Sequence, residues 1–529
     1  MSDLIPVHRA LFSVSNKTGL IPFAKRLAGR GVKIISTGGT ASALREAGIN
    51  VTAVDQVTEF PEMMDGRIKT LHPRIHGGLL ALRDEPSHMT AMTEHGIDPI
   101  DLVCVNLYPF EQTVSQPDVT NEKAIENIDI GGPSMVRSAA KNHRFVTVVT
   151  DPSQYEQVDD ELDANRGATR LSTRRKLALA AFARTAAYDA AITNWFSARL
   201  DQPLREHLLL SYRRHPDVLR YGENPHQSAA LYVDPGDSEP SIVRARKHHG
   251  IALSYCNLFD ADGSLELVKE IDPAQYAAAA VVKHANPCGF AIAEDLSEAL
   301  AKAYAGDPLA AYGGIVAVNR PIDQAAADAI CAGKKFLHVI VAPGYDEPAL
   351  AQLKQRWKDV RLLEVDPLGK PSDRSAGQME LKRVTGGILV QNRDLATFDE
   401  VEKWPHVAGP VPKLEDLRDI ALAMICVKHL KSNAVCLVKD QMLVGAGAGQ
   451  MDRLQSSRIA VTKAGERSRG SVAGSDAFFP FRDGPDQLIA AGVRAIVQPG
   501  GAKKDADVIA ACNEADVTMV FTGRRHFRH

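Results

Sequence analysis

A lysine and a histidine stand side by side where the apolar run of "AAAAVVKHANPCG" ends, as Lys283 and His284. Successive side chains of a strand point to opposite faces, so the pair can share one target only if the strand ends there and the backbone bends. Pro287 and Gly289 predict a turn directly after the pair. Such a bend would place a cation and a proton-transferring ring together. A surface lysine beside a hydrogen-bonded histidine is the plain alternative.

Two strand ends near the N-terminus carry small hydroxyl and glycine residues before a helical pattern, in "SVSNKTGL" and "STGGT". Free backbone N–H groups at a helix start, together with the helix dipole, favour an anion such as phosphate. Ordinary helix capping explains each loop singly, but two such loops in one sheet favour a phosphate site. The candidate residues are Ser13, Ser15, Lys17, Ser36, Thr37, Gly39 and Thr40.

Other polar clusters in the first domain contrast with the acidic chain. "DGRIKTLHPRIHGG" brings together five basic or imidazole side chains, which favours an anionic substrate over a solvated loop. "NLYPF" and "NIDIGGPSMVRSAAKNH" add a phenol, a carboxylate and another ammonium. The candidates are Arg67, Lys69, His72, Arg74, His76, Tyr108, Asp129, Arg137 and Lys141.

Two motifs of the second half combine aromatic and charged residues. "LRYGENPHQ" contains Arg220, Tyr221 and His226, and is too polar for a core segment. "SDAFFPFRDG" places three phenylalanines beside carboxylates. Phenylalanines in this number usually belong to a core, but aromatics beside carboxylates can also hold a flat heterocycle.

Metal and thiol chemistry are weaker interpretations. Zinc deaminases combine H-x-E with P-C-x-x-C, whereas here Asn286 takes the position of the glutamate and no second cysteine follows Cys288. The sequence therefore predicts no catalytic metal. The seven cysteines are scattered without a C-x-x-C pair, which argues against a disulfide framework. Cys288 could act as a nucleophile only with a lowered thiol pKa.

The composition is that of a large globular protein. A chain of 529 residues exceeds one core and suggests three or four domains. The net charge of -3 argues against broad nucleic-acid or anionic-membrane binding. We find no signal-peptide pattern and no long apolar run, so we expect a cytoplasmic protein.

Strand-like runs alternate with helical patterns, which predicts an α/β fold. In the first domain the runs are "RALFSV", "VKIIS", "DLVCVNLYPF" and "RFVTVVT", and a helix is expected over 173–200. Asp201-Gln202-Pro203 breaks that helix. Further strands follow, and the charged segment 346–374, which shows no clear pattern, separates two groups of them. The predicted domains are 1–204, 205–370 and 371–529.

The motifs quoted above, together with "KSNAVC", "GAGQMDR" and "GRRHFRH", closely resemble the bifunctional AICAR transformylase/IMP cyclohydrolase family in order along the whole chain. The resemblance implies formyl transfer from 10-formyltetrahydrofolate to AICAR, giving FAICAR and tetrahydrofolate, and then dehydrative closure of FAICAR to IMP. It also implies a methylglyoxal-synthase-like parallel-sheet domain followed by two cytidine-deaminase-like α/β subdomains without zinc. A homodimer with transformylase sites at the interface, no nucleic-acid partner and no membrane are expected.

Residue roles follow from the same resemblance. His284 would deprotonate the AICAR amine and Lys283 would stabilise the formyl oxyanion. AICAR contacts would be Arg220, Tyr221, His226, Asn257, Gly313, Asn433, Arg453, Phe478 and Arg525. Pro480, Phe481 and Asp483 would meet the folate. In the cyclohydrolase, the hydroxyl and glycine loops with Lys17 and Arg67 would hold phosphate and ribose, and Lys69, Tyr108, Asp129 and Lys141 would relay protons.

Small departures from the family pattern remain. Asn16, Cys256, Ala311 and Asp452 stand where we expect Asp, Asn, Ser and Ser. Asp452 adjoins Arg453, which puts AICAR or folate affinity in question. For the first domain, a phosphate-sensing regulatory module is the rival interpretation. It differs from an enzyme in needing Lys69 and Lys141 for binding only.

Overall fold

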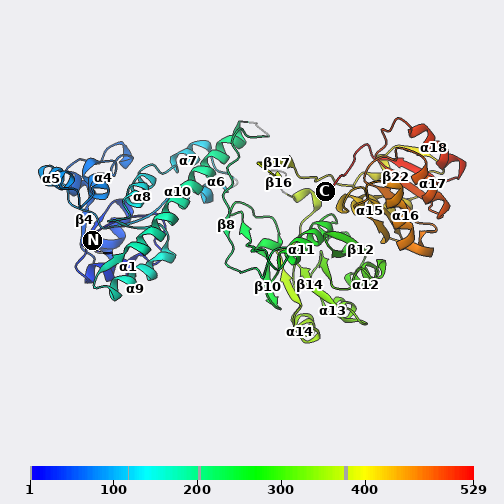
Figure 1. Cartoon of the computed structure of the whole chain (residues 1–529), viewed down its shortest axis with the longest axis horizontal. Coiled ribbons are helices and arrows are strands. Elements are labelled where there is room, and N and C mark those ends of the chain that lie inside the picture. Colours follow the sequence, from blue (N-terminus) through cyan, green and yellow to red (C-terminus); the bar gives the residue numbers. More distant parts are fainter. Residues whose placement is uncertain (1–2, 117, 201–203, 375–378) are drawn as a thin grey trace. The chain divides into compact units, whose positions relative to one another are not determined.

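The computed structural model describes residues 3–116, 118–200, 204–374 and 379–529. The chain divides into two compact units, and the main division falls between Tyr212 and Arg213. In Figure 1 the first unit runs from blue to cyan and the second from green to red. The predicted helix break at Asp201-Gln202-Pro203 lies outside the described residues.

The first unit contains a five-stranded parallel sheet in the order β4-β3-β2-β5-β6. Its strands are β2 (Arg9–Val14), β3 (Lys33–Ser36), β4 (Val51–Ala53), β5 (Leu102–Asn106) and β6 (Thr147–Val149). Four of the five coincide with the predicted apolar runs. The chain passes outward from β2 through β4 and then returns to β5 on the other side of β2. The point between β2 and β5 is where such sheets bind ligands, outside their carboxyl ends.

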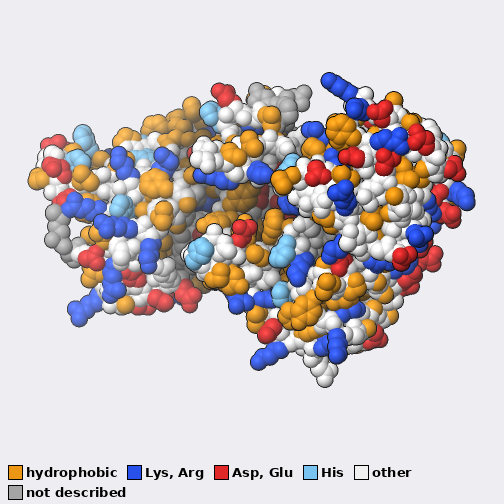
Figure 2. All heavy atoms as spheres, turned by 45° about the vertical axis from the view of Figure 1, so that its right-hand side comes forward, with side chains coloured by type: hydrophobic (Ala, Val, Ile, Leu, Met, Phe, Trp, Pro, Cys, Tyr) orange, Lys and Arg blue, Asp and Glu red, His pale blue; other side chains and the backbone are white. Residues whose placement is uncertain are grey.

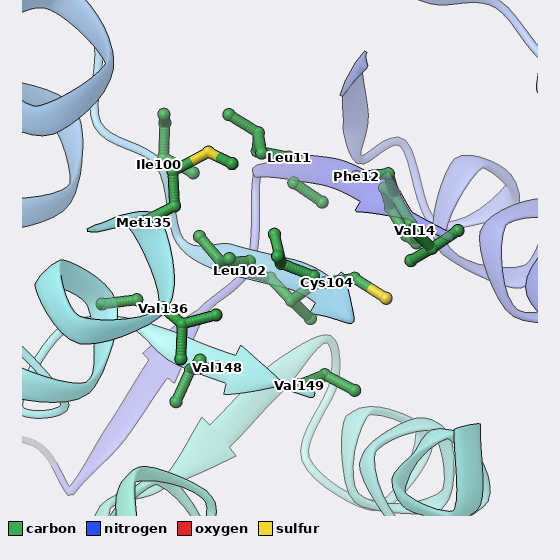
Figure 3. Close-up of a cluster of buried hydrophobic side chains, with 14 of the residues drawn as sticks. Leu11, Phe12, Val14, Ile100, Leu102, Cys104, Met135, Val136, Val148 and Val149 are labelled. Atoms are coloured by element: carbon green, nitrogen blue, oxygen red, sulfur yellow. The ribbon is translucent and has the colours of Figure 1, made fainter. Parts of the chain in front are cut away.

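Helices pack on this sheet and close its core. Figure 3 shows side chains of β2, β5 and β6 meeting Met135 and Val136 from a neighbouring helix. The long helix α10 (Leu171–Arg199) confirms the prediction over 173–200. The other main elements of the unit are α1 (Leu20–Gly29), α2 (Gly38–Glu46), α3 (Val54–Thr58), α4 (Pro73–Leu80), α5 (Pro86–Glu94), α6 (Phe110–Val114), α7 (Asn121–Glu126), α8 (Gly131–Lys141), α9 (Tyr155–Ala164), β1 (Leu4–Pro6) and β7 (Ala168–Arg170).

The second unit contains one 12-stranded mixed sheet in the order β10-β15-β14-β13-β11-β12-β20-β19-β21-β22-β23-β18. The strands of its first half are β10 (Arg246–His249), β11 (Ala277–Lys283), β12 (Asn286–Ala293), β13 (Gly314–Val318), β14 (Leu337–Ala342) and β15 (Arg361–Glu364). Those of its second half are β18 (His406–Ala408), β19 (Val435–Lys439), β20 (Met442–Gly447), β21 (Val472–Ser475), β22 (Ala495–Gln498) and β23 (Thr518–Phe521).

The two halves of this sheet have the same topology. In each half, a hairpin (β11-β12 or β19-β20) is followed by three strands that run parallel to one another, and an antiparallel strand closes the outer edge. The halves meet where β12 pairs antiparallel with β20. The helices that precede the hairpins, α11 (Tyr255–Val268) and α15 (Leu414–His429), also correspond. The prediction of two similar α/β subdomains agrees with this duplication.

The expectation that residues 346–374 lack regular structure is wrong. Helix α14 (Glu347–Arg356) and strand β15 lie in this segment. Helix α14 buries only Ala349 and Leu353, so its charged remainder faces solvent and hides the helical pattern. The predicted boundary at residue 370 falls between β15 and the exposed hairpin of β16 (Met379–Val384) and β17 (Gly387–Asn392).

Helices of the second unit cover both faces of the sheet. Besides α11, α14 and α15 they are α12 (Leu296–Gly306), α13 (Gln324–Cys331), α16 (Arg453–Ala464), α17 (Asp483–Ala490) and α18 (Asp505–Glu514). Across the described ranges of the chain, we find no helix with the length and apolarity that a membrane span requires. On the face shown in Figure 2, basic and acidic side chains are intermingled.

A buried ionic cluster joins the two halves beneath the sheet. The Glu270 carboxylate, 1% exposed, accepts hydrogen bonds from Arg374 at 3.0 Å, Lys428 at 2.9 Å and His429 at 2.9 Å. Arg528 donates to His429 Nδ1 at 3.1 Å, so the ring is held as the tautomer whose Nε2–H donates to Glu270. Burial would raise the pKa of Glu270, but His429, Lys428 and Arg374 lower it to about 2.

Replacing Glu270 by Gln should destabilise the second unit by ~3–5 kcal/mol, because Arg374 and Lys428 would stay buried without their carboxylate. Urea unfolding of Glu270→Gln beside Glu402→Gln, which changes an exposed carboxylate, measures the difference. The parent should also lose stability in acid. The unfolded carboxyl binds its proton near pH 4.3 and the folded one only near 2, so stability is lost as pH falls through that window. Burial lowers the pKa of His429, which acts in the same direction. Equal stability of the two variants would contradict the prediction.

Candidate functional sites

The backbone bends at His284 itself and not after it. His284 and Ala285 form a two-residue loop between β11 and β12, with φ of 52° and 56°. The prediction that Pro287 and Gly289 make the turn is therefore wrong, since both lie within β12. A Cβ at Gly289 would come 1.8 Å from the Ala303 carbonyl oxygen, so this glycine lets α12 pack closely on the strand.

Asp260 holds this loop in place. Its carboxylate accepts the backbone N–H of Ala285 at 2.7 Å and of His284 at 3.3 Å. Side chains at positive φ are strained unless their surroundings fix them, and these two hydrogen bonds do so. Burial raises the pKa of Asp260, and the two N–H groups offset part of that rise.

The second half of the sheet contains the same kind of carboxylate-bound two-residue loop, but without a histidine. The β19-β20 loop is Asp440 and Gln441, at φ of 53° and 61°, and Asp419 on α15 accepts both of their N–H groups. The loop and its carboxylate are therefore a structural feature of the fold. A histidine beside the preceding lysine is what distinguishes the first loop.

The Lys283 ammonium points along the sheet edge, where it donates to the Tyr312 carbonyl at 2.8 Å. Gly313 follows directly, at a φ of 75°. Asn257 lies in the first turn of α11, where it completes a capping box with Ser254. These residues form one group at the edge where Lys283 lies.

The loop of Arg220 lies beside that group. Arg220 is exposed, its backbone N–H donates to the Leu253 carbonyl at 3.3 Å, and its guanidinium lies 5.5 Å from the Tyr221 ring. His226 is exposed in the turn closed by the hydrogen bond from Gly222 to Gln227. Arg220 and Tyr221 therefore lie at the start of α11, beside Asn257, where the Tyr255 N–H donates to the Tyr221 carbonyl at 3.4 Å.

The remaining predicted AICAR contacts lie around β19 and β21. The Asn433 amide donates to the Gln450 carbonyl at 2.9 Å. Arg453 is bound to Asp476 at 2.5 Å and to Ser475 at 2.9 Å, so much of its hydrogen-bonding capacity is already used within the chain. Phe478 is 39% exposed, whereas Phe479 is 1% exposed and belongs to the core. The aromatic motif therefore contributes Phe479 to the core and leaves Phe478 accessible, so that a ligand contact by Phe478 stays a prediction.

The predicted folate contacts are accessible. Pro480, Phe481 and Asp483 are exposed at the start of α17, and Lys504 lies 4.9 Å from the Phe481 ring centre. Arg525 is also exposed, with its guanidinium 4.7 Å from the Phe527 ring.

The C-terminal tail is fixed to the second half rather than frayed. His526 is buried and bonded to Asp394 at 2.6 Å. The carbonyl oxygens of Arg528 and His529 accept from Ser432 N and Lys431 Nζ.

Within one chain, the Lys283 group and the Phe478 group lie well apart. Strand β11 is separated from β21 by four strand spacings, or about 19 Å. Register places Lys283, Asn433 and Ser475 toward the same edge of the sheet. The chain thus presents two half-sites along one edge.

Neither thiol nor metal chemistry gains support at this edge. Burial raises the pKa of Cys288 to about 12, and its thiol donates to the Val281 carbonyl at 3.3 Å. This thiol is therefore no nucleophile near neutral pH. Within the part of the chain that the structure describes, no group of three His, Cys, Asp or Glu side chains could hold a metal ion.

In the first unit, the candidate residues gather at the carboxyl ends of β2, β3 and β5. Asn106, the last residue of β5, accepts the backbone N–H groups of Ser15 and Asn16 at 2.7 and 3.0 Å, and the Ser15 hydroxyl at 3.0 Å. Sequence reasoning did not select Asn106, although it belongs to the quoted "NLYPF" motif. Its carboxamide holds the loop between Ser13 and Lys17 across the switch point.

Several hydroxyls of this edge stabilise the fold. Ser36 donates to the Phe12 carbonyl at 2.8 Å, and Thr40 exchanges hydrogen bonds with Val14. Thr37 is the N-cap of α2, where Gly39 is exposed. Free backbone N–H groups at this helix start remain suited to an anion.

Three of the four predicted relay residues lie together. A Cβ at Gly38 would lie 3.3 Å from the Lys69 ammonium, which places that cation at the start of α2. The next residue, Thr70, touches Gly131 at the start of α8, beside Asp129. Burial raises the pKa of Asp129. Burial, together with the negative charges of Asp129 and Glu126, raises the pKa of Tyr108.

Lys141 does not join them. It is the last residue of α8, so the helix separates it from Asp129 by about 15 Å or more. The sequence does not show this separation directly, because Asp129 and Lys141 both belong to the motif "NIDIGGPSMVRSAAKNH".

The side chains of the basic motif in the first unit contact different partners. Arg67 is exposed and pairs with Glu126. His72 caps α4, Arg74 pairs with Glu59 at 2.9 Å, and His76 contacts Ser138.

Two departures from the family pattern have simple structural roles. Asp452 is the N-cap of α16 and accepts the N–H of Gln455 at 2.7 Å, a role that serine fills equally well. Asn16 accepts the N–H of Thr18 at 3.0 Å in a local turn. Ala311 is buried, and Cys256 is partly exposed with its sulfur 4.0 Å from the Glu223 carbonyl.

Comparison with known proteins decides the family. The AICARFT/IMPCHase bienzyme profile matches residues 139–463, and the MGS-like domain profile matches residues 19–134. The bifunctional purine biosynthesis protein PurH of Cereibacter sphaeroides is 50% identical over 100% of both chains. PurH of Magnetococcus marinus is 51% identical over 99% of both. The chain belongs to the AICARFT/IMPCHase bienzyme family. As a member of the AICARFT/IMPCHase family it is a bifunctional enzyme of purine biosynthesis, with transformylase and IMP cyclohydrolase activities that complete IMP synthesis.

A solved structure described as the crystal structure of ForH covers 36% of this chain and 99% of its own, at 36% identity and a TM-score of 0.33.

Proposed function

We propose that Lys283 and His284 carry out formyl transfer from 10-formyltetrahydrofolate to the 5-amino group of AICAR. The AICAR amine is a weak nucleophile because its lone pair is delocalised into the imidazole ring. His284 removes the amine proton as attack proceeds, and Lys283 stabilises the negative charge that develops on the formyl oxygen. The bond between the formyl carbon and N10 then breaks, and N10 of tetrahydrofolate takes up a proton. The observation that supports this assignment is the clamped His284 loop, whose counterpart in the second half has the same backbone but no histidine.

We further propose a cytoplasmic homodimer in which each transformylase site combines two half-sites. The Lys283 group of one copy would face the Asn433, Arg453, Phe478 and Arg525 group of another. The four strand spacings between β11 and β21, about 19 Å, separate Lys283 from Phe478 within one chain and support this arrangement. Asn433 lies closer to the His284 loop, since the nearby Lys431 N–H donates to Asn286 Oδ1 at 3.0 Å. Pro480, Phe481 and Asp483 would then hold the folate beside the nucleotide.

For the cyclohydrolase, we propose the carboxyl edge of the first sheet. The loops that carry Ser15 and Thr37 hold the phosphate and ribose of FAICAR, and Lys69, Tyr108 and Asp129 move the protons of ring closure. Aligning the amide nitrogen with the formyl carbon supplies much of the rate enhancement. We assign no role to Lys141 beside Asp129 in the same chain.

One assay tests both halves of this proposal. Purified protein incubated with AICAR and 10-formyltetrahydrofolate should release tetrahydrofolate and form IMP, followed separately by their absorbance. FAICAR supplied alone should give IMP without any folate. Formation of IMP that needs folate even from FAICAR would contradict a separate cyclohydrolase site.

A further inference from the structure

The long helix α10 carries a buried tyrosine close to both segments of the proposed proton relay. Helix α10 packs against α6 and α8, the helices that follow Tyr108 and Asp129 (Figure 1). Tyr188 lies on α10 and is 1% exposed. A buried hydroxyl is costly unless it forms hydrogen bonds. The partners of this hydroxyl therefore indicate what Tyr188 holds in place.

The Tyr188 hydroxyl forms two hydrogen bonds with the main chain just before α8. It accepts the Asp129 N–H at 2.9 Å and donates to the Asn127 carbonyl at 3.0 Å. Burial raises the pKa of Tyr188 to about 12, so the hydroxyl keeps its proton near neutral pH and continues to donate. One side chain thus fixes both ends of the short segment that presents Asp129.

The Asp129 carboxylate has further contacts of its own. Its Oδ1 accepts the Gly132 N–H at 2.8 Å in the first turn of α8. A Cβ at Gly132 would come 2.2 Å from Asp129 Oδ2, so glycine leaves the room that this carboxylate occupies. Burial raises the pKa of Asp129, and the N–H groups of Gly132 and Tyr108 offset part of that rise. These contacts keep their geometry only while the backbone of Asp129 stays in place.

The ring of Tyr188 contacts the Tyr108 segment as well. Its centre lies 6.1 Å from that of Phe110 in an edge-to-face arrangement, and Phe110 is fully buried. Phe110 begins α6 two residues after Tyr108, within the "NLYPF" motif. Tyr188 therefore contacts the two segments through different parts of its side chain, the hydroxyl and the ring.

We infer that Tyr188 is a positioning residue for the closure of FAICAR and acts through Asp129. This inference rests on the proposed role of Asp129 in moving the protons of ring closure. Proton transfer requires the two groups within hydrogen-bond reach, and a misplacement of about 1 Å can cost about 100-fold in rate. The hydroxyl of Tyr188 prevents such a shift because it binds the main chain of Asp129 and leaves the carboxylate accessible to substrate.

Tyr188→Phe tests this role because it removes the hydroxyl and keeps the ring against Phe110. The variant should lower kcat for FAICAR closure about 10-fold, the effect of a lost hydrogen bond, with KM unchanged and formyl transfer at the parental rate. Tyr155→Phe is the matched control. Tyr155 is a buried tyrosine of the same unit whose hydroxyl accepts the Cys104 thiol at 3.5 Å, and its variant should close FAICAR at the parental rate.

Rates are measured well below the Tm of each variant, so that lower stability alone does not reduce kcat. A parental kcat in Tyr188→Phe, a change confined to KM, or an equal loss in Tyr155→Phe would overturn the inference. Should Tyr188→Phe fail to fold, 3-fluorotyrosine at position 188 keeps the shape of the side chain and weakens the hydroxyl as an acceptor for the Asp129 N–H. It should then lower kcat by a smaller factor, and a parental kcat would overturn the inference.

A double variant separates this inference from the proposed role of Asp129. Asp129→Ala should lower kcat about 10²-fold, and adding Tyr188→Phe should lower it no further, because Tyr188 acts through Asp129. If Tyr188→Phe costs the same factor with and without the Asp129 carboxylate, the inference fails while the role of Asp129 stands. If Asp129→Ala closes FAICAR at the parental rate, the proposed role of Asp129 fails, and the inference fails with it.

Discussion

Formyl transfer is expected to fall about 10²- to 10⁴-fold in His284→Ala, while closure of FAICAR to IMP continues at the parental rate. The loss is large because the AICAR amine needs a base during attack, and general-base assistance is typically worth that much. Cyclisation should be spared because the residues proposed for it lie in the other unit. Tetrahydrofolate release measures the first reaction, and IMP formation from FAICAR measures the second.

The duplicated sheet offers a matched control for this variant. Asp440 occupies the same position in the β19-β20 loop, at a φ of 53° against 52° for His284. Asp440→Ala therefore introduces the same side chain at the same strained backbone without touching the reaction. A formyl-transfer rate in Asp440→Ala as low as in His284→Ala would mean that loop strain causes the loss. If His284→Gln transferred formyl groups at the parental rate, the imidazole of His284 could not be the base.

Lys69→Ala is expected to slow IMP formation from FAICAR by at least about 10²- to 10³-fold and to leave formyl transfer intact. The ammonium lies at the start of α2, and the next residue, Thr70, contacts Gly131 at the start of α8, so the ammonium can meet charge that develops during ring closure. FAICAR consumption under single-turnover conditions measures the effect on the chemical step.

Lys25→Ala serves as the control for Lys69, because Lys25 is an exposed lysine of α1 in the same unit. Comparable loss of both activities in Lys69→Ala would show that the two sites are not independent. Weaker FAICAR binding with unchanged turnover would instead favour the phosphate-sensing interpretation of the first domain.

Local patterns in the sequence were sufficient to predict most of the sheet. The runs that became β2, β3 and β5 have continuous apolar centres because parallel strands are covered on both faces. Segment 346–374 escaped because α14 buries only two of its residues and β15 is short. The duplication was expected from the family resemblance, but local patterns could not show how the two halves join, because strand order and pairing depend on contacts between distant segments.

The site residues show the same limit. The motif around Lys283 predicted a bend beside the pair, but the bend depends on Asp260, which lies 24 positions earlier than His284 and has no local signature. His284 and Ala285 also lack the Gly or Asn that usually announces a two-residue loop at positive φ. Lys141 was grouped with Asp129 by motif, whereas helix geometry sets them apart. Tyr188 lay in no motif and is noticeable only because the fold brings its hydroxyl to the backbone of Asp129.

The edge-to-edge pairing of β12 with β20 has an evolutionary consequence. In a protein built from two halves of the same fold, both halves can retain the fold while only one retains reactive residues. In the second half, the hairpin that turns at Asp440 and Gln441 carries no histidine. Under the proposed assignment, the second half is left to hold substrate through the side chains around Asn433 and Phe478, while the first half carries out the reaction.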